Sequence, residues 1–285
     1  MAAKNEWKER APAKVNLWLR VLGKREDGFH EIETRMLEIG VADELCVTRL
    51  SEGTDPVLSC EGADLPVDES NLVVKALRVL ERECARSFPV EMVLKKNIPH
   101  GAGLGGGSSD AAALFRAVNG LFELGYSMDA LRRMAATIGS DVAFFLEGGA
   151  CDCRGRGEQV ESVAWETPLR LLLAKPDFPV PTPWAYQSWK TSQEMPEFSY
   201  TPQTFSWGSL VNDLERPVFE KHLVLGVMKT WFLQRAGVAG ALMSGSGSTV
   251  LAVLEEETDA EALGEKMKEE FGSTLWVCET VTAGG

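Results

Sequence analysis

The sequence predicts an α+β protein with two domains. Segments of strand character and segments of helical periodicity alternate along the 285 residues, with no internal repeat and no low-complexity tract. This length is sufficient for one large or two modest cores. Turn-rich and proline-rich stretches interrupt the regular pattern between residues 148 and 183. We therefore expect a boundary within residues 160–166, dividing the chain into residues 1–162 and 163–285.

The individual elements follow from the spacing of apolar residues. Helical spacing predicts helices at residues 71–85, 110–121, 127–138, 223–234 and between Thr258 and Gly272. Ser108 or Ser109 is the expected N-cap of the second of these helices. Runs of β-forming residues predict strands at 15–22, 44–50, 90–94 and 249–254. No periodicity is visible between residues 186 and 207, so an irregular surface segment is expected there.

Composition and charge narrow the class of protein. The formal net charge of -13 argues against a nucleic-acid or anionic-membrane binder, because either needs a basic face. Backbone N–H groups with one or two lysines can still form a local anion site. No apolar run approaches the length of a membrane span and the N-terminus lacks the core of a signal peptide, so we expect a cytoplasmic protein. Six scattered cysteines are expected to be reduced, and three histidines argue against a zinc site.

The most informative segment is GAGLGGGSSD, residues 101–110. So many glycines before a helix cost backbone entropy, which is explained if the loop adopts special dihedral angles or lets a ligand approach the main chain. A helix N-terminus presents unpaired N–H groups and partial positive charge, which suit phosphate. The spacing Gly101-x-Gly103-x-x-Gly106 also matches a dinucleotide fingerprint, but no parallel-sheet alternation surrounds it, and the P-loop lysine is absent. A flexible surface loop is the alternative.

Four shorter segments carry polar residues in unusual settings. Lys14, taken alone, is a solvated charge at a strand end. Asp141 lies between a helix end and a strongly apolar run, where burial would perturb its ionisation, although it could also cap a short helix. Residues 27–30, Asp-Gly-Phe-His, form a β-turn on the simplest interpretation. Residues 244–248, Ser-Gly-Ser-Gly-Ser, similarly suggest a plain hairpin turn.

Taken together and in order, these segments resemble the GHMP kinase superfamily of ATP-dependent small-molecule kinases. The matching stretches are PAKVNL from Pro12, RxDGFH from Arg25, GLGGGSSD from Gly103, GSDV from Gly139, GRGE from Gly155 and SGSGST from Ser244. They extend from about residue 11 to residue 253. The doubled serine and the Asp-Gly-aromatic-His element resemble those superfamily members whose small-molecule substrate carries a cytidine diphosphate group.

The resemblance implies a fold and a role for individual residues. The implied fold joins an N-terminal, ATP-binding domain like domain 2 of ribosomal protein S5 to a ferredoxin-like, substrate-binding C-terminal domain. Lys14 and Asp141 are the implied catalytic residues, with Asp141 as the base for the substrate hydroxyl and Lys14 as the cation beside it. The implied substrate contacts are Asn16, Phe29, His30 and Tyr186, with Phe29 and Tyr186 stacking on the cytosine. The implied ATP contacts are Pro99, Gly101, Gly103, Leu104, Gly105, Gly106, Gly107, Ser108 and Ser109.

The resemblance also implies cofactors and leaves alternatives. ATP is the implied co-substrate and carries Mg²⁺, for which no protein ligand is assigned. We expect a monomer or weak homodimer without nucleic-acid or membrane partners. Phe29 stands where tyrosine is usual, which keeps a stacking ring without its hydroxyl, and Asp110 stands where asparagine is frequent, which places a carboxylate near the phosphates. The alternatives are a superfamily kinase for another alcohol and an inactive nucleotide sensor. Retention of both Lys14 and Asp141 argues against the sensor.

Overall fold

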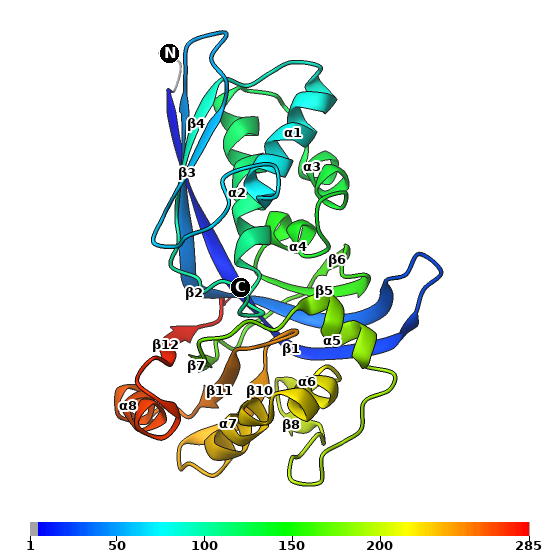
Figure 1. Ribbon diagram of the computed structural model, residues 1–285, viewed down its shortest axis with the longest axis vertical. Coiled ribbons are helices and arrows are strands. Elements are labelled where there is room, and N and C mark those ends of the chain that lie inside the picture. Colours follow the sequence, from blue (N-terminus) through cyan, green and yellow to red (C-terminus); the bar gives the residue numbers. More distant parts are fainter. Residues whose placement is uncertain (1–4, 285) are drawn as a thin grey trace.

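Two β-sheets form the framework of the protein (Figure 1). The structure is a computed structural model that describes residues 5–284. The larger sheet has the strand order β3-β4-β2-β1-β9-β8, with β5 and β6 continuing from β2, and the smaller sheet has the order β10-β11-β7-β12. The strands are β1 (Glu6–Lys24), β2 (His30–Arg49), β3 (Val57–Glu61), β4 (Val90–Lys95), β5 (Ala150–Gly155), β6 (Gln159–Ser162), β7 (Arg170–Lys175), β8 (Gln203–Phe205), β9 (Gly208–Asn212), β10 (Val238–Met243), β11 (Val250–Leu254) and β12 (Trp276–Val281).

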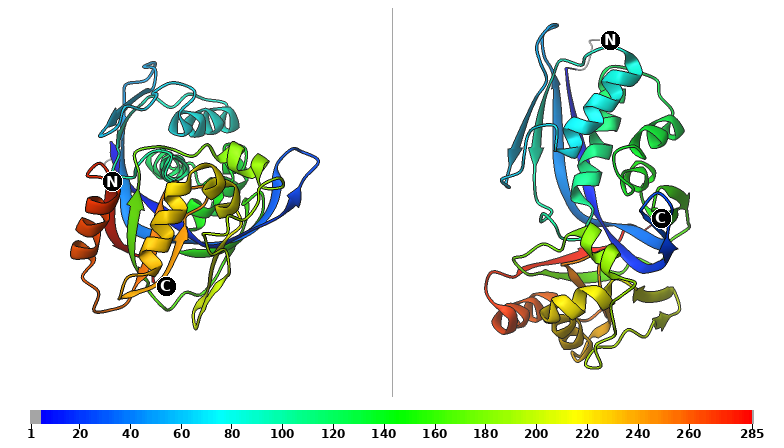
Figure 2. Two further views of the ribbon diagram at one scale, coloured as in Figure 1. Left: turned by 60° about the horizontal axis from the view of Figure 1, so that its bottom comes forward. Right: turned by 45° about the vertical axis from the view of Figure 1, so that its right-hand side comes forward.

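Eight helices are described, and they separate into two groups (Figure 2). Helices α1 to α4 cover one face of the larger sheet, and α7 and α8 pack against the smaller one. Among the residues from 5 to 284, no helix is long and apolar enough to cross a membrane. The helices are α1 (Leu72–Cys84), α2 (Gly106–Leu121), α3 (Met128–Ala135), α4 (Val142–Glu147), α5 (Thr182–Ser188), α6 (Glu215–Lys221), α7 (Leu223–Leu233) and α8 (Ala260–Phe271).

Strands β1 and β2 form one long antiparallel hairpin. Bulges interrupt its register between Pro12 and Ala13 and between Asn16 and Trp18. Because side chains alternate along a strand, Lys14 and Asn16 share one face. Residues 11–17 are buried on both faces, since α2 covers one side and the smaller sheet covers the other. A lysine at this point is therefore taken out of solvent by the architecture itself.

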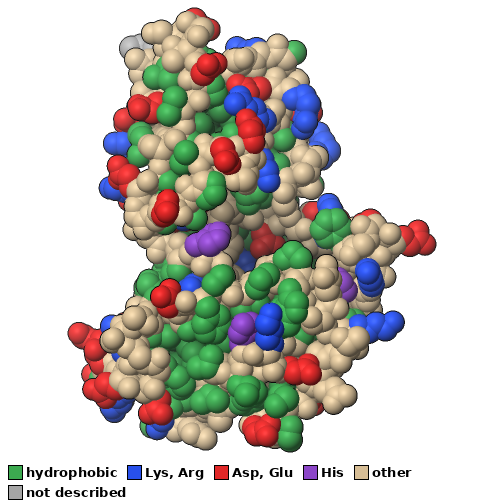
Figure 3. All heavy atoms as spheres, in the orientation of Figure 1, with side chains coloured by type: hydrophobic (Ala, Val, Ile, Leu, Met, Phe, Trp, Pro, Cys, Tyr) green, Lys and Arg blue, Asp and Glu red, His purple; other side chains and the backbone are tan. Residues whose placement is uncertain are grey.

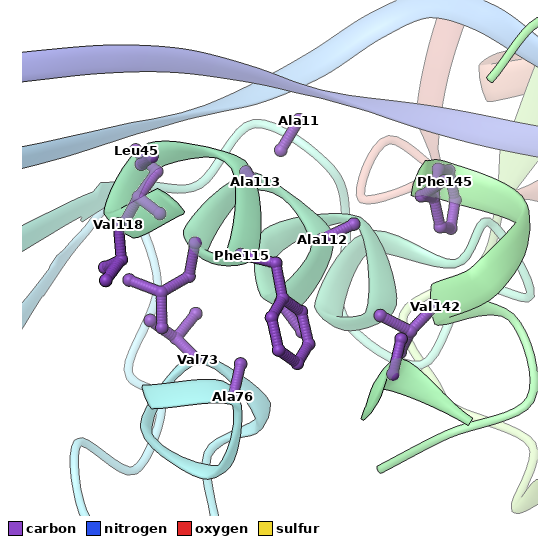
Figure 4. Packing of buried hydrophobic residues seen from close by; sticks show 14 of the residues in the cluster. Ala11, Leu45, Val73, Ala76, Ala112, Ala113, Phe115, Val118, Val142 and Phe145 are labelled. Atoms are coloured by element: carbon purple, nitrogen blue, oxygen red, sulfur yellow. The ribbon is translucent and has the colours of Figure 1, made fainter. Parts of the chain in front are cut away.

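Helix α2 is the centre of the N-terminal core (Figure 4). Its small residues Ala112 and Ala113 allow close approach to neighbouring elements, while Phe115 and Val118 fill the space toward the other helices. Val142 and Phe145 of α4 pack near the N-terminal end of α2. This packing fixes the direction in which the N-terminus of α2 points.

The smaller sheet has a ferredoxin-like topology. Its strands and the helices that cover them follow the order β7, α7, β10, β11, α8, β12, and neighbouring strands are antiparallel. The first strand, β7, lies in the middle of the sheet and pairs with β11 and β12. This arrangement confirms the predicted α+β class and the ferredoxin-like C-terminal half.

The predicted elements are largely present, with two corrections. Helix α2 begins at Gly106, with Gly105 as its N-cap in the left-handed region, so neither Ser108 nor Ser109 caps it. A glycine N-cap has no side chain that marks it in the sequence, whereas serine is a common N-cap and therefore predicts the wrong position here. The segment at 186–207 is not wholly irregular, because it includes the end of α5 and strand β8.

The division at residue 162 stays a prediction. It falls between β6 and β7, where the chain passes from one sheet to the other. The later hairpin of β8 and β9 nevertheless returns to the larger sheet, where β9 pairs in parallel with β1 at Trp18 and Leu19. The two halves of the chain are therefore joined by strand pairing as well as by side chains.

Residues 212–215 connect the two parts. The Asn212 side chain donates to the carbonyl oxygens of Met243 and Gly245, both at 2.7 Å, and accepts from the N–H of Leu214 at 2.9 Å. Asp213 accepts from the backbone N–H of Val21 at 2.8 Å. This segment therefore ties β9 to β1 and to the loop between β10 and β11.

We predict that Asn212→Ala lowers the free energy of unfolding by about 1–3 kcal/mol, because it leaves buried carbonyl and N–H groups unpaired. Chemical denaturation measures this loss. Asn97→Ala is the matched control, since that amide makes one exposed hydrogen bond to Ala42, and a loss below about 0.5 kcal/mol is expected. Equal losses in the two variants would contradict the connecting role of Asn212.

Candidate active site

A deep cleft opens where the two parts of the molecule meet. Its volume is about 980 Å³. Figure 3 shows the surface hollowed between the upper and lower halves. The walls come from β1 and the start of β2, the glycine loop at 98–108, residues 140 and 141, α5 and the loop at 244–248. A cleft of this size between two packed units is the usual setting for small-molecule binding.

Lys14 lies at the floor of the cleft. Its Nζ donates to Asn16 Oδ1 at 2.6 Å and to the carbonyl oxygen of Gly103 at 2.9 Å. It also lies 3.8 Å from Asp141 Oδ2. Burial lowers the pKa of Lys14, and the charge of Asp141 partly opposes that shift. The Lys14 ammonium thus connects β1, the glycine loop and the Asp141 carboxylate.

Asp141 occupies the N-cap position of α4 but does not act as a cap. Its side chain makes no capping hydrogen bond to that helix, and about a third of it, 33%, is exposed. Both Asp141 and Ser140 line the cleft. The carboxylate therefore faces the cleft with Lys14 beside it, and a carboxylate in this position can accept a proton from a bound hydroxyl.

The glycine loop is held against both halves of the protein. Gly101, Gly103 and Gly105 have φ angles of 63°, 74° and 74°, which side chains rarely adopt. A Cβ on Gly103 would lie 2.2 Å from the carbonyl oxygen of Ser244, so the loop between β10 and β11 packs directly on it. A Cβ on Gly105 would lie 2.7 Å from the Phe145 ring. The loop is thus a packed, structured element.

The loop leads into the open N-terminus of α2. Gly105 has no side chain to cap that helix, and the bond from Ser109 N–H to the carbonyl oxygen of Gly105 closes its first turn. The N–H groups of the three residues before Ser109 have no intrahelical acceptor. Since Gly106, Gly107 and Ser108 line the cleft, these donors form a cradle for an anion.

Aromatic rings line the other end of the cleft. The His30 ring stacks on Tyr186 with a centroid distance of 5.5 Å and contacts Trp189 edge-on at 6.4 Å. Burial lowers the pKa of His30, and the charge of Lys24 lowers it further. Phe29 is half exposed, and the Arg156 guanidinium lies over its ring at 4.6 Å. The ring that stacks on Tyr186 is thus His30.

The cleft brings together nearly all the residues that the sequence singled out. Lys14, Asn16, Phe29, His30, Asp141, Tyr186, Pro99 and the glycine loop through Ser108 line it. Ser109 does not, because it is fully buried behind the first turn of α2. Sequence reasoning missed Arg156, Lys96 and Ser246, which also line the cleft. Arg156 lay within a quoted motif, but nothing in the sequence placed its side chain over Phe29.

Comparison with known proteins agrees with this geometry. Residues 71–149 match the GHMP kinases N terminal domain, and residues 203–273 match the GHMP kinases C terminal domain. The chain therefore belongs to the GHMP kinases, a class of ATP-dependent small-molecule kinases. Homoserine kinase from Cytophaga hutchinsonii shares the fold at 20% identity, with a TM-score of 0.69 over 99% of this chain and 96% of that one.

More similar relatives identify one family within the GHMP kinases. The chain is 40% identical over 258 residues to 4-diphosphocytidyl-2-C-methyl-D-erythritol kinase from Methylacidiphilum infernorum, covering 90% of this chain and 89% of the relative. The Synechococcus sp. enzyme of the same name is 36% identical, with coverage of 96% and 94%. A crystal structure of 4-(cytidine 5'-diphospho)-2C-methyl-D-erythritol kinase matches with a TM-score of 0.77 at 32% identity, over 98% of this chain and 100% of that one. The chain belongs to the 4-diphosphocytidyl-2-C-methyl-D-erythritol kinase family.

We predict that Gly105→Ala weakens ATP binding by about tenfold or more, because the added methyl group would displace the Phe145 ring and the loop with it. Gly149→Ala is the matched control, since Gly149 also has a positive φ, 65°, but no heavy atom lies within 4 Å of its Cβ position. Calorimetric titration with ATP and thermal melting are measured for both variants. An unchanged ATP affinity in Gly105→Ala, with lowered stability, would reduce the loop to a structural role.

Proposed function

We propose that the protein transfers the γ-phosphoryl group of ATP to the 2-hydroxyl of 4-diphosphocytidyl-2-C-methyl-D-erythritol. The products are the 2-phosphate and ADP, and the reaction is a step of non-mevalonate isoprenoid precursor biosynthesis. The observation that carries this proposal is the Lys14–Asp141 pair at 3.8 Å. It lies in one cleft with the anion cradle of α2 and with the His30–Tyr186 stack. The names of the relatives support the substrate.

Asp141 is the proposed general base. Its partly exposed carboxylate accepts the proton of the substrate hydroxyl as the oxygen attacks the γ-phosphorus. Lys14 offsets negative charge that develops during transfer. Because Asn16 and the Gly103 carbonyl hold the ammonium in place, it needs little reorganisation during the reaction.

ATP is bound by the glycine loop, with its phosphates on the N–H groups of α2. The proposed fit of the triphosphate to this site rests on the uncapped N-terminus of α2 and on the glycines that bring the main chain to the cleft. When bound with the nucleotide, Mg²⁺ would neutralise phosphate charge. Within residues 5–284 no cluster of three or more acidic, histidine or cysteine side chains could hold a metal.

The cytidine end of the substrate is recognised by the aromatic side of the cleft. Tyr186 supplies a stacking face, and the neutral His30 ring supplies edge contacts after it moves off that face. Phe29 forms a second aromatic wall nearby. Arg156, over that wall, supplies positive charge on this side of an otherwise acidic protein.

An ADP-release assay across several alcohols tests the assignment. We expect turnover with 4-diphosphocytidyl-2-C-methyl-D-erythritol and at least a hundredfold lower kcat/KM with mevalonate, homoserine or galactose, because none of these offers a base to stack. A higher kcat/KM with any of the other three would support another superfamily kinase. No ADP release with any alcohol, despite ATP binding, would support an inactive sensor.

We predict that Asp141→Asn lowers kcat by about 10²–10⁴ while ATP affinity changes little, because the amide cannot take the proton. Single-turnover phosphoryl transfer and ATP titration measure the two quantities. Asp64→Asn removes another cleft-lining carboxylate and is expected to keep kcat within about threefold. A fall below tenfold in Asp141→Asn would remove Asp141 from the role of base.

We predict that Tyr186→Ala raises KM for the cytidine-bearing substrate by about tenfold or more and leaves KM for ATP unchanged, since stacking contributes about 1–3 kcal/mol per base. Tyr186→Phe is the matched control, because it keeps the ring, and its KM is expected to stay near that of the parent. Steady-state kinetics with each substrate varied separates the effects. A parallel rise in both KM values would indicate general damage to the cleft.

We further propose that the protein works in the cytoplasm as a monomer or weak homodimer. Its partners are small molecules, without nucleic acid or membrane. The formal net charge of -13 supports the absence of nucleic-acid and membrane partners, because it disfavours polyanionic surfaces.

A further inference from the structure

A buried cluster of three charged side chains lies beneath the anion cradle. Lys96, just after β4, forms ion pairs with Asp43 of β2 and, at 2.6 Å, with Asp110 Oδ2 of α2. All three side chains are at most 5% exposed. The proposed mechanism uses none of them, yet Lys96 and Asp110 both line the cleft.

The cluster fixes the chain where it enters the glycine loop. Asp43 Oδ1 accepts from the backbone N–H groups of Asn97 at 2.6 Å and Ile98 at 2.8 Å. The Lys96 ammonium lies 3.3 Å from where a Cβ on Gly106 would be, directly against the first residue of α2. Asp43, Lys96 and Asp110 therefore join β2, the loop entry and the helix that presents the anion cradle.

The charges of the cluster do not balance. Two carboxylates face one ammonium, so the fully ionised cluster carries one negative charge and the singly protonated cluster carries none. Asp43 has donors for both oxygens, whereas Asp110 Oδ1 is buried without a hydrogen-bond partner in the part of the chain that is described. A buried carboxylate oxygen without a donor is costly when ionised, and the cost falls when it carries a proton.

The surroundings of Asp110 favour protonation near neutral pH. Burial raises the pKa of Asp110 to about 7, Lys96 opposing the rise and Asp43 adding to it. The thiol of Cys60 on β3 also lies near the cluster, and since burial raises its pKa it is uncharged near neutral pH. Asp64, which lines the cleft, also interacts electrostatically with the Cys60 thiol.

We propose that Asp110 is a positioning residue that takes up a proton from solvent when ATP binds, which makes the Asp43–Lys96–Asp110 cluster neutral beneath the phosphates. This inference rests on the proposed binding of ATP phosphates at the N-terminus of α2. An uncompensated negative charge there repels the triphosphate, whereas a neutral cluster leaves the helix N–H groups and the Lys96 ammonium to attract it. Linkage makes the effect reciprocal, so pH controls ATP affinity through this carboxyl.

The sign of the pH effect follows from the proton count. Well below pH 7 most of the free protein already holds the proton, so ATP binding takes up little and affinity is at its highest. Above pH 7 the proton must be acquired on binding, and affinity falls as pH rises. We expect the Kd for ATP, at saturating Mg²⁺, to rise by about fivefold or more between pH 6 and 8.5.

Calorimetric titration of ATP into the full-length protein in two buffers of different ionisation enthalpy at pH 7.5 tests the proposal. We expect uptake of a measurable fraction of a proton by the parent protein and its loss in Asp110→Asn, whose Kd changes less than twofold over the same pH range. The ionisation of ATP itself is common to both proteins and cancels in the comparison. Asp152→Asn is the matched control, because it removes a carboxylate paired with Arg35 outside the cleft and should keep the parent's proton uptake.

Each other outcome overturns the proposal in a recognisable way. No proton uptake by the parent protein contradicts it without any variant, so a poorly folding Asp110→Asn does not prevent the test. Uptake that persists in Asp110→Asn assigns the proton to another group. If ATP does not bind the parent protein at all, the proposed function fails, and this inference with it.

Discussion

The position of one buried ammonium sets the geometry of the whole site. Lys14 Nζ donates hydrogen bonds to Asn16 on its own strand and to the carbonyl oxygen of Gly103 in the glycine loop. It also forms an ion pair with Asp141, which precedes α4. A lysine can stay charged in a buried place only if such partners surround it. The strand, the loop and the helix must therefore all be in place before Asp141 lies beside Lys14.

The loops of the two halves reinforce this arrangement. The loop between β10 and β11 lies so close to Gly103 that no side chain fits, and Ser244 Oγ donates to the Gly103 carbonyl at 3.2 Å. The N–H of Thr249 donates to the Ala102 carbonyl. The second glycine-serine segment, which resembled a plain hairpin turn, is indeed a turn between antiparallel strands, and it also supports the glycine loop. The cleft thus lies where the two sheets meet.

The sequence predicted much of this because its strongest signals are local. Helix α1 lies within one residue of its predicted ends at both termini, since Asn71 caps it and Ala85 ends it in the left-handed region. Lys14 and Asp141 were paired from the family resemblance, because no local rule brings together residues so far apart in the chain. The residue spacing alone left each of them with a plain structural alternative.

What could not be predicted depends on tertiary contacts. Lys96, Asp43 and Asp110 are ordinary charged residues in their own segments, and only the packing of α2 on β2 makes them one buried cluster. Asp110, whose carboxylate lies near the proposed phosphate site, is paired with Lys96, and the proposed proton removes the negative charge that this pairing leaves. The stacking of His30 on Tyr186 depends on how α5 folds over the start of β2, which residue spacing does not encode.

A crystal structure with a non-hydrolysable ATP analogue and 4-diphosphocytidyl-2-C-methyl-D-erythritol would test the central role of Lys14 and Asp141 most directly. The account predicts the 2-hydroxyl oxygen within about 3 Å of the Asp141 carboxylate, with the γ-phosphate on the far side of that oxygen and Lys14 still beside Asp141. A hydroxyl bound away from Asp141, or a Lys14 that leaves the carboxylate in the ternary complex, would contradict it.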